Sequence, residues 1–360
     1  MIIPVQLGAR SYSIVVESEA LATVGARLRD LRVGARAALI CDDAIMRLHG
    51  KAVAEGLRAA GFTLTLVDVP EGEGAKTLKV AERCWDALLA AGLDRSSTVL
   101  ALGGGAVGDV AGFVAATYMR GMNFVQLPTT VLAQVDASIG GKTAIDHPLA
   151  KNLIGAFYQP RLVITDPATT RTLPEREFRS GLAEIVKHGV VLDAAYFAEL
   201  EAHTAAVLAR DLPVLERIIG GSCRLKAHVV ERDEREAELR AVLNYGHTIG
   251  HALEAASGYA AYTHGEAVSL GMTAEARLAR RLGIADAETV ERQERLLAAL
   301  GLPVRMTPLD HDAVLSAMSR DKKARDGRLP FVLAPAIGSF RLVHDVRAAD
   351  VRAVLEEIQA

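Results

Sequence analysis

Residues 98–113 read TVLALGGGAVGDVAGF, an apolar run that ends in clustered glycines and continues as a second apolar run. With the residues that follow, this stretch is long enough to resemble a membrane span, but Asp109 and the glycines at turn-like positions argue against one. We therefore expect a buried strand, a tight loop and a helix. Gly103, Gly105 and Gly108 have the GxGxxG spacing, which lets a backbone approach a phosphate at a helix N-terminus. A purely structural turn has the same spacing, so the motif alone does not decide between the two.

Strand and helix patterns alternate along the chain before this stretch. Two short runs at the N-terminus predict a β-hairpin, and two later runs predict strands separated by helices; these runs cover residues 3–8, 11–16, 36–41 and 62–69. Alternation at this spacing is typical of a parallel sheet covered by helices. From about Glu175 the apolar periodicity becomes mostly helical. We therefore predict an α/β domain over residues 1–170 and a mostly α-helical domain over residues 171–360.

Ligands of a parallel sheet bind beyond the carboxyl ends of its strands. The sequence places Asp42, EGEGAK (71–76) and GGGAVGD (103–109) directly after predicted strands. A standard dinucleotide fold has an acidic residue about 20 positions after the glycines, but NFVQLPTT (123–130) occupies that region here. We therefore expect nucleotide binding on a parallel sheet without the usual fingerprint, with Asp42 as a candidate acid.

The segment from 120 to 160 is dense in polar residues interleaved with glycine. We expect Lys142, Lys151 and Asn152 to lie in loops near the ligand edge of the sheet. The tetrapeptide GGKT (140–143) does not complete GxxxxGK[ST], which excludes an ATPase of the Walker type.

Composition limits the classes of partner and the compartment. The chain has 360 residues, of which 50% are hydrophobic and 24% charged, as in ordinary globular proteins. Its net charge of −3 argues against nucleic acid or an anionic membrane as a partner. Three cysteines without a CxxC pair, and an N-terminus without a signal-peptide pattern, lead us to expect a cytoplasmic protein.

The stretch LNYGHTIGHALE (243–254) contains the strongest chemical pattern. Placed on a helix, it and the preceding turn align five polar side chains on one face: Arg240, Asn244, His247, His251 and Glu254. Two imidazoles spaced i, i+4 can chelate a divalent metal, and His264 offers a third. An isolated pair can equally be two structural histidines.

In GLAEIVKHG (181–189), Glu184, Lys187 and His188 share a helical face. An exposed Glu–Lys pair is one interpretation. The functional interpretation is a carboxylate ligand beside a lysine that faces a substrate, and His188 alone is better explained as structural.

Together these motifs resemble the 3-dehydroquinate synthase family within the sugar phosphate cyclases. The resemblance extends over nearly the whole chain. It is carried by GGGAVGDVAGF (103–113), the segment 120–160, LPEREFRSGLAEIVKHG (173–189), LNYGHTIGHALE (243–254), HGEAVSLGM (264–272) and DKK (321–323). Three positions depart from the family pattern without being expected ligands, namely Asp146, Ala150 and His188.

The resemblance implies one divalent metal, zinc or alternatively cobalt, held by Glu184, His247 and His264. It implies NAD bound by Asp42, Glu71, Glu73, Lys76, Gly104, Gly105, Asp109, Thr129, Thr130, Lys142, Lys151, Thr169 and Thr172. It also implies substrate contacts from Asp136, Lys142, Asn152, Lys187, Lys226, Arg240, Asn244, His251 and a lysine of DKK, Lys322 or Lys323. Arg120 is expected to reach the site of a neighbouring subunit, which implies a homodimer.

The reaction implied is the shikimate-pathway step, in aromatic amino-acid biosynthesis, that converts 3-deoxy-D-arabino-heptulosonate 7-phosphate to 3-dehydroquinate and phosphate. It would proceed by transient oxidation at C5 by NAD, β-elimination of phosphate, re-reduction and aldol closure, which makes the enzyme a carbon–oxygen lyase. The alternatives are another sugar phosphate cyclase and an iron- or zinc-dependent polyol dehydrogenase. The cationic residues argue against the dehydrogenase, since a polyol has no anion to bind.

Overall fold

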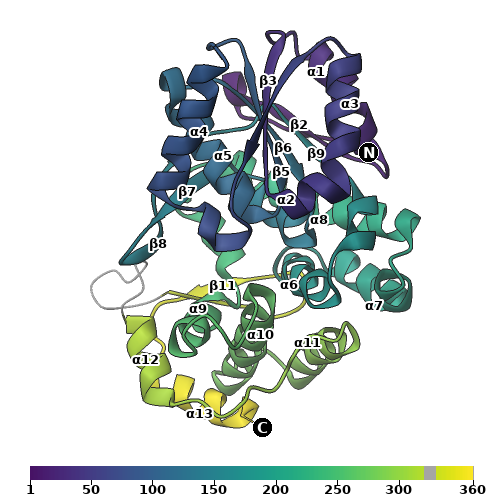
Figure 1. Cartoon of the computed structure of the whole chain (residues 1–360). Helices are drawn as coiled ribbons and strands as arrows, with labels where there is room; N and C mark the ends of the chain where they lie inside the picture. The colour runs from purple at the N-terminus through teal and green to yellow at the C-terminus, as the bar shows by residue number, and fades with distance from the viewer. Residues whose placement is uncertain (320–329, 360) are drawn as a thin grey trace. The chain divides into compact units, whose positions relative to one another are not determined.

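The computed structural model describes residues 1–319 and 330–359 (Figure 1). Contacts divide the chain into two compact units. The first unit comprises Met1–Pro174 with Leu215–Arg235, and the second comprises Glu175–Val214 with Glu236–Ala360. Most of one long helix, α8 (Leu212–Arg232), thus groups with the first unit, although it follows the first two helices of the second. The functional division near residue 170 stays a prediction.

A seven-stranded sheet forms the centre of the first unit. In spatial order its strands are β1 (Ile2–Val5), β2 (Tyr12–Val16), β9 (Leu162–Thr165), β6 (Asn123–Pro128), β5 (Thr98–Gly103), β3 (Arg36–Cys41) and β4 (Thr63–Asp68). The β1–β2 pair is antiparallel, and the other pairs are parallel. The predicted hairpin and the predicted strands are therefore confirmed.

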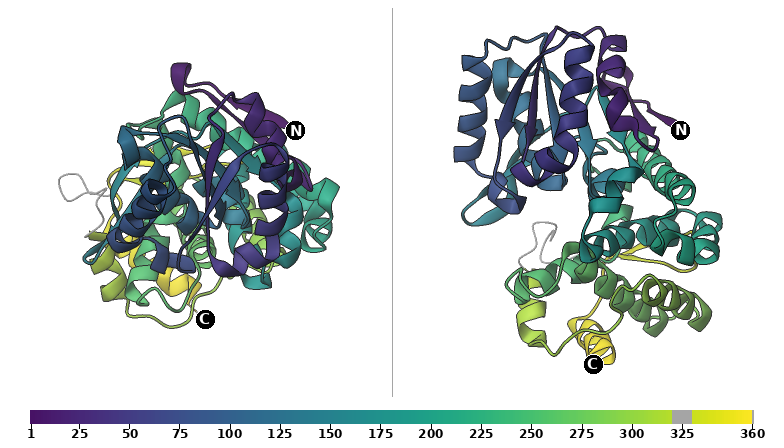
Figure 2. Two further views of the ribbon diagram at one scale, coloured as in Figure 1. Left: turned by 45° about the horizontal axis from the view of Figure 1, so that its top comes forward. Right: turned by 45° about the vertical axis from the view of Figure 1, so that its right-hand side comes forward.

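Helices cover both faces of this sheet (Figure 2). The helical segments of this unit are η1 (Gly8–Arg10), η2 (Ala20–Thr23), α1 (Val24–Asp30), α2 (Asp43–Ile45), η3 (Met46–Gly50), α3 (Lys51–Ala59), η4 (Gly72–Ala75), α4 (Leu78–Ala90), α5 (Gly105–Thr117), η5 (Tyr118–Arg120), η6 (Ala133–Ala137), η7 (Pro167–Thr172) and α8. Strand β3 shows how the two faces are used. Ala38 and Ile40 pack with side chains of α4 and α5, whereas Ala37 and Leu39 pack with those of α1 and α3. Burial on both faces explains why β3 is a continuous apolar run instead of an alternating one.

The glycines of the 98–113 stretch allow close packing of α5. A Cβ on Gly108 would lie 2.7 Å from Oε1 of Gln126, and one on Gly112 would lie 2.3 Å from Cγ2 of Thr143. The strand, loop and helix predicted for this stretch are confirmed by β5 and α5. Part of the glycine pattern therefore has a packing role that is independent of any ligand.

Residues 142–157 form a second, antiparallel pair of strands, β7 (Lys142–His147) and β8 (Ala150–Phe157). The prediction that Lys142, Lys151 and Asn152 lie in loops is wrong, because all three are strand residues. The short connection at residues 148–149 closes a hairpin, and cross-strand pairing then fixes the extended backbone on both sides.

The second unit is mostly helical, with α6 (Glu175–Leu192), α7 (Ala194–Leu208), η8 (Leu239–Asn244), α9 (His247–Ala256), α10 (His264–Arg281), α11 (Ala287–Ala299), α12 (His311–Ser319), α13 (Ala348–Ile358) and a hairpin of β10 (Phe331–Leu333) and β11 (Arg341–Val343). Helix α10 is central, because it packs against α6, α9, α11 and α13. The predicted fold class, an α/β part with a parallel sheet followed by a mostly helical part, is confirmed. Among the described residues, no helix combines the length and the apolar character that crossing a bilayer requires.

Candidate active site

The spacing predicted one continuous helix for the polar stretch 240–254, and this prediction is wrong. Helix α9 begins only at His247, and the residues before Tyr245 form the 3-10 turn η8. Gly246 separates the two with a φ of +77°, a conformation that glycine adopts without strain. His247, His251 and Glu254 therefore share a helical face, whereas Arg240 and Asn244 lie in the preceding turn.

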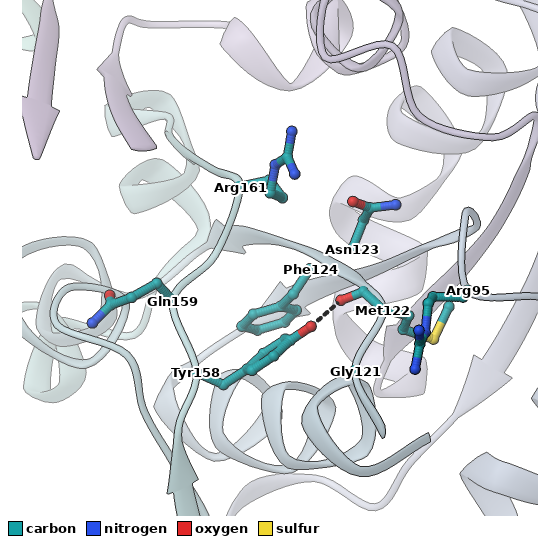
Figure 3. A pocket seen from close by; sticks show the side chains of 8 residues that line it. All are labelled: Arg95, Gly121, Met122, Asn123, Phe124, Tyr158, Gln159 and Arg161. Atoms are coloured by element: carbon teal, nitrogen blue, oxygen red, sulfur yellow. Dashed lines mark hydrogen bonds between the residues drawn. The ribbon is translucent and has the colours of Figure 1, made fainter. Parts of the chain in front are cut away.

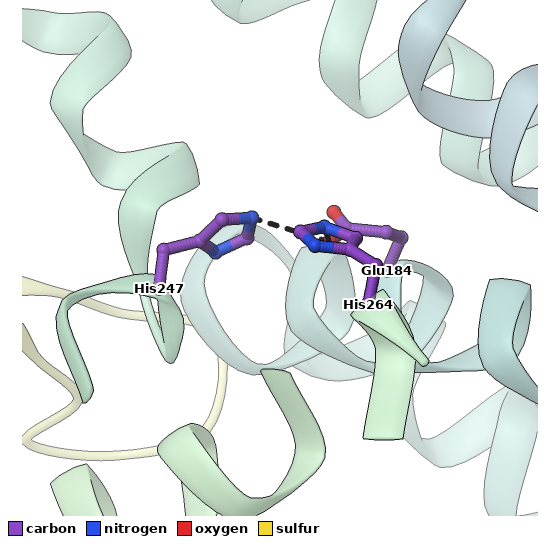
Figure 4. Close-up of side chains that lie close together, drawn as sticks. All are labelled: Glu184, His247 and His264. Atoms are coloured by element: carbon purple, nitrogen blue, oxygen red, sulfur yellow. Dashed lines mark ion pairs between the residues drawn. The ribbon is translucent and has the colours of Figure 1, made fainter. Parts of the chain in front are cut away.

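Three side chains from three helices of the second unit converge on one point (Figure 4). Glu184 comes from α6, while His247 and His264 are the first residues of α9 and α10. Oε1 of Glu184 lies 3.4 Å from Nε2 of His247 and 3.6 Å from Nε2 of His264. One donor atom from each residue falls within 4.8 Å of the others, which is a spacing that a single ion can bridge.

Close helix packing produces this convergence. Gly265 of α10 meets α6 so tightly that a Cβ would lie 1.8 Å from the carbonyl oxygen of Ser180, and its own N–H donates to Oγ of Ser180 (3.0 Å). Ser180 lies about one helical turn before Glu184. The contact therefore sets His264, the neighbour of Gly265, beside the carboxylate.

The electrostatics of Glu184 fit a metal ligand. Its side chain is fully buried, and neither carboxylate oxygen accepts a hydrogen bond of ordinary geometry. Burial favours the neutral acid, but the positive charge of Lys187 outweighs it and holds the pKa of Glu184 well below its usual value. Lys187 is also buried and forms an ion pair with Glu184. Glu184 is therefore a buried, ionised carboxylate that pairs with one cation, Lys187, and that both histidines approach, as a metal-ligating carboxylate would.

Both histidines direct Nε2 at this carboxylate, but their pKa values are shifted in opposite directions. Burial and the charge of Lys187 lower the pKa of His247 well below its usual value, which keeps the ring neutral. Its Nδ1 lies 3.0 Å from the carbonyl of Tyr245, which leaves the Nε2 lone pair for an ion. Burial also lowers the pKa of His264, but the carboxylates of Glu184 and Glu254 beside the ring outweigh burial and raise it to about 10. An ion must therefore displace a proton from His264.

A second group of possible ligands overlaps the first and comprises His251, Glu254 and His264. The ring centroid of His251 is 5.2 Å from that of His247 and 6.0 Å from that of His264. Helical spacing alone suggested chelation by His247 and His251, but the carboxylate nearest His247 is Glu184, from another helix.

A buried acid that the sequence analysis did not single out, Glu275, holds the backbone directly before His247. Oε2 of Glu275 accepts the N–H of Gly246 at 2.6 Å, directly before His247. Glu275 is fully buried on α10. The only sequence signal was its place among the apolar residues of that helix.

The first unit brings together two predicted substrate residues. Nζ of Lys226, from α8, donates to the backbone oxygen of Asp136 (2.6 Å) and to its carboxylate (2.5 Å). Lys226 is 4% exposed, so this cation is largely withdrawn from water. Lys322 and Lys323 lie outside the described residues.

The candidate nucleotide residues follow neighbouring strands at one edge of the sheet. Cys41 pairs with Asp68, and Gly103 pairs with Pro128, so the strands β3, β4, β5 and β6 end at the same level. The residues that follow these ends are Asp42, Glu71, Glu73, Lys76, Gly104, Gly105, Thr129 and Thr130. This edge is the one at which parallel sheets bind ligands.

Several of these residues already have structural partners. Asp42 accepts the N–H of Ile45 and caps α2, while Thr130 accepts the N–H of Ala133. The hydroxyl of Thr169 donates to the carbonyl of Thr129 (3.2 Å). Capping of α2 is therefore enough to explain an aspartate at position 42, without a bound nucleotide.

Lys76 links the EGEGAK loop to α5 and to the β7–β8 hairpin. Its Nζ is 2.7 Å from the carboxylate of Asp109 and also donates to the amide oxygen of Asn152. Burial raises the pKa of Asp109 to about 6, in spite of the opposing charge of Lys76. Asp146 departs from the family pattern, yet its carboxylate accepts the N–H of Asn152 (2.7 Å), a bond that an amide oxygen would also accept.

A pocket of about 200 Å³ in the first unit lies away from these residues (Figure 3). Its lining includes Arg95, Asn123, Tyr158 and Arg161, and the Tyr158 hydroxyl donates to the carbonyl of Met122 (2.5 Å). Asn123 begins β6 and Arg161 directly precedes β9. The pocket is therefore at the amino edge of the sheet, and we do not assign a nucleotide to it.

Comparison with protein families gives two consecutive matches, "3-dehydroquinate synthase N-terminal" over residues 66–180 and "3-dehydroquinate synthase C-terminal" over residues 181–324. The chain belongs to the 3-dehydroquinate synthase family. The 3-dehydroquinate synthase of Geobacter metallireducens is 51% identical over 98% of this chain and 97% of its own. That of Desulforamulus reducens is 48% identical over 99% of both chains.

Solved structures agree with membership of the 3-dehydroquinate synthase family. The 2-epi-5-epi-valiolone synthase of Streptomyces hygroscopicus, with NAD+ and Zn2+ bound, has a TM-score of 0.88 at 29% identity and covers 96% of both chains. A 2-deoxy-scyllo-inosose synthase with carbaglucose-6-phosphate, NAD+ and Co2+ has a TM-score of 0.87 at 26% identity, covering 99% of this chain and 100% of its own. A probable glycerol dehydrogenase from Sinorhizobium meliloti, at 17% identity and TM-score 0.66, shares the fold alone.

Proposed function

We propose that this protein is a 3-dehydroquinate synthase that converts 3-deoxy-D-arabino-heptulosonate 7-phosphate to 3-dehydroquinate and phosphate, with NAD and one zinc or cobalt ion. The observation that carries the proposal is the convergence of Glu184, His247 and His264 within a chain of this family. One carboxylate and two imidazoles form a donor set that suits a catalytic divalent ion with open positions. When bound, the ion would supply a Lewis acid for a substrate hydroxyl, and NAD a reversible hydride acceptor.

The protein's own residues would bind and orient an anionic substrate. Each unit contains buried cationic side chains of the kind that a phosphate and a carboxylate require, including Lys187, Lys226 and Arg240. A cation that is largely withdrawn from water binds an anion more strongly than one on the surface. We assign Asp136 to the substrate as well as to holding Lys226 in place, and Asn244 and His251 to hydroxyl or carboxylate groups of the substrate. The remaining substrate contacts, from Lys142, Asn152 and Lys322, are part of the same proposal.

We assign NAD to the carboxyl edge of the sheet. Asp42 and the EGEGAK loop would contact its ribose and phosphate groups, and Gly104 and Gly105 would let the backbone approach at the start of α5. Lys76 and Asp109, which belong to the same assignment, form an ion pair that links this loop to α5. The remaining assigned residues are Thr129, Thr130, Lys142, Lys151, Thr169 and Thr172.

One assay tests this function against its alternatives. The protein is incubated with the heptulosonate phosphate, trace NAD and zinc, while phosphate and NADH are followed together. We expect many equivalents of phosphate without accumulation of NADH, because the hydride is returned in each cycle. NADH formed in proportion to product would indicate a polyol dehydrogenase. Turnover only with sugar phosphates that lack the carboxylate would indicate another cyclase.

We further propose a cytoplasmic homodimer in which Arg120 serves the partner's site. Cys41, Cys84 and Cys223 are buried free thiols, as expected for a reducing compartment. Met119 and Arg120 both have positive φ values, 52° and 62°, and such strain in consecutive non-glycine residues is typical of functional turns.

Subunit complementation tests the role of Arg120. We expect Arg120→Ala and Glu184→Gln to be separately inactive, and their mixture, after dissociation and reassociation, to recover up to about a quarter of wild-type turnover. Recovery is expected because, in a mixed dimer, one site would receive both intact residues, and half of randomly formed dimers are mixed. A mixture as inactive as its components, although heterodimers are detected by mass spectrometry, would place Arg120 in its own subunit's site.

A further inference from the structure

The imidazole of His264 lies between two carboxylates that approach different ring nitrogens. Oε1 of Glu184 is 3.6 Å from Nε2, and Oε1 of Glu254 is 3.4 Å from Nδ1. Two groups of possible metal ligands, both made of residues of the second unit, therefore share the side chain of His264. A neutral imidazole has one lone pair and one N–H, so it can bind an ion on one side and donate a hydrogen bond on the other. Filling both groups at once would require removal of the second ring proton.

The surroundings of His247 decide which group holds the ion. Its Nδ1 faces the carbonyl of Tyr245, so its Nε2 lone pair points to Glu184, as does Nε2 of His264. The carboxylate of Glu184 is fully buried and its oxygens accept no hydrogen bonds of ordinary geometry. The side chain of Glu254 is 15% exposed, so its charge is partly solvated. An ion is attracted more strongly by the first group, because the charge of Glu184 is buried whereas that of Glu254 is partly solvated.

We propose that Glu254 is a positioning residue for the metal ligand His264. Its carboxylate accepts the Nδ1–H of His264, which fixes the ring tautomer and directs the Nε2 lone pair at the ion beside Glu184. The inference rests on the proposed metal centre and adds to it a residue outside the expected metal, nucleotide and substrate sets. Partners of this kind orient ligating histidines and raise their basicity.

The helix packing explains why this partner is needed and how it is placed. The backbone at the start of α10 is held by a capping box between Thr263 and Glu266, which fixes the Cα of His264 but not its ring. Helix α9 approaches α10 at Gly250, where a Cβ would lie 3.0 Å from the carbonyl oxygen of Ala267. Glu254 follows Gly250 by about one turn, and so it reaches the His264 ring from the neighbouring helix.

The test measures metal binding apart from catalysis. Full-length wild type, Glu254→Ala, Glu254→Gln and Ser257→Ala are stripped of metal and titrated with Co2+, and the visible spectrum and the ion count per chain are recorded. We expect one ion per wild-type chain, and an affinity lowered roughly 10- to 100-fold in Glu254→Ala with an altered Co2+ spectrum. Glu254→Gln should recover most of the affinity and the wild-type spectrum, because its amide oxygen still accepts the Nδ1–H. Ser257→Ala, which changes a hydroxyl near the end of the same helix, should bind as wild type does.

Two outcomes would overturn the proposal. Wild-type affinity and spectrum in Glu254→Ala would show that the carboxylate does not orient His264. Two ions per wild-type chain, with one lost in both Glu254→Ala and His251→Ala, would make Glu254 a ligand of a second ion. On our assignment His251→Ala keeps its single ion, because His251 serves the substrate. These readouts require no turnover, so the assay with the heptulosonate phosphate tests the proposed function independently.

Discussion

The Glu184→Ala variant is expected to lose its bound metal and its turnover together. Glu184 supplies the only carboxylate of the proposed Glu184–His247–His264 donor set, and the charge it carries is the term that most favours a divalent ion there. We expect metal affinity to fall by more than the roughly 10- to 100-fold that loss of an outer-shell partner costs. Metal analysis of the purified variant and phosphate release measure the two losses separately.

Alanine at position 184 also leaves Lys187 buried without its ion-pair partner. Removing one member of a buried pair typically costs roughly 3–5 kcal/mol, so loss of metal in this variant could reflect unfolding. Glu184→Gln answers this point, because it keeps the side-chain volume and an oxygen for Lys187 while removing the charge. A matched control is Glu177→Ala, which removes an exposed carboxylate from the same helix. Full metal occupancy in folded Glu184→Gln and Glu184→Ala would disprove the ligand assignment.

The Gly271→Ala variant is expected to be strongly destabilised. A Cβ at this position of α10 would lie 1.9 Å from the carbonyl oxygen of Gly246 and 2.8 Å from the backbone nitrogen of Gly250. Both neighbours are backbone atoms, so relief requires α9 to move away from α10. Alanine in a helix usually stabilises by about 1 kcal/mol relative to glycine. Here the steric conflict makes alanine destabilising instead. We expect the free energy of unfolding to fall by an amount at or above the upper end of the roughly 1–3 kcal/mol that is typical of overpacking.

Thermal unfolding followed by circular dichroism measures this effect. A loss of about 3 kcal/mol corresponds to a fall in Tm of roughly 6–12 °C for a unit of this size. Metal binding should weaken as well, because Gly246 directly precedes the ligand His247. Gly74→Ala is the control, since its nearest contact would be Cβ of Pro70 at 3.6 Å. A Tm for Gly271→Ala at or above that of wild type would show that the close approach of the two helices is not required.

The sequence by itself determined the class of fold and the family. Strand and helix patterns of residues 1–113 predicted the hairpin, the parallel strands and the glycine turn into α5, because hydrophobic periodicity and glycine turns act over a few residues. The motifs that resemble the 3-dehydroquinate synthase family are also short stretches of sequence, and they were sufficient to identify the family. The strand character of Lys142, Lys151 and Asn152 escaped prediction, since polar, glycine-rich sequence resembles a loop until a partner strand supplies the pairing.

The tertiary structure alone decided how the helical face of residues 240–254 is divided. Periodicity favoured one continuous helix, but Gly246 adopts a left-handed conformation against α10 and restarts the helix at His247. Spacing along one helix suggested His247 and His251 as a chelating pair, whereas packing of α6, α9 and α10 brings Glu184 and His264 to His247 instead. Those contacts depend on glycines at helix crossings, which bring together ligands that lie 17 to 80 positions apart in the chain. Sequence patterns report which face of a helix is polar, and only the packing of that helix determines what its polar groups meet.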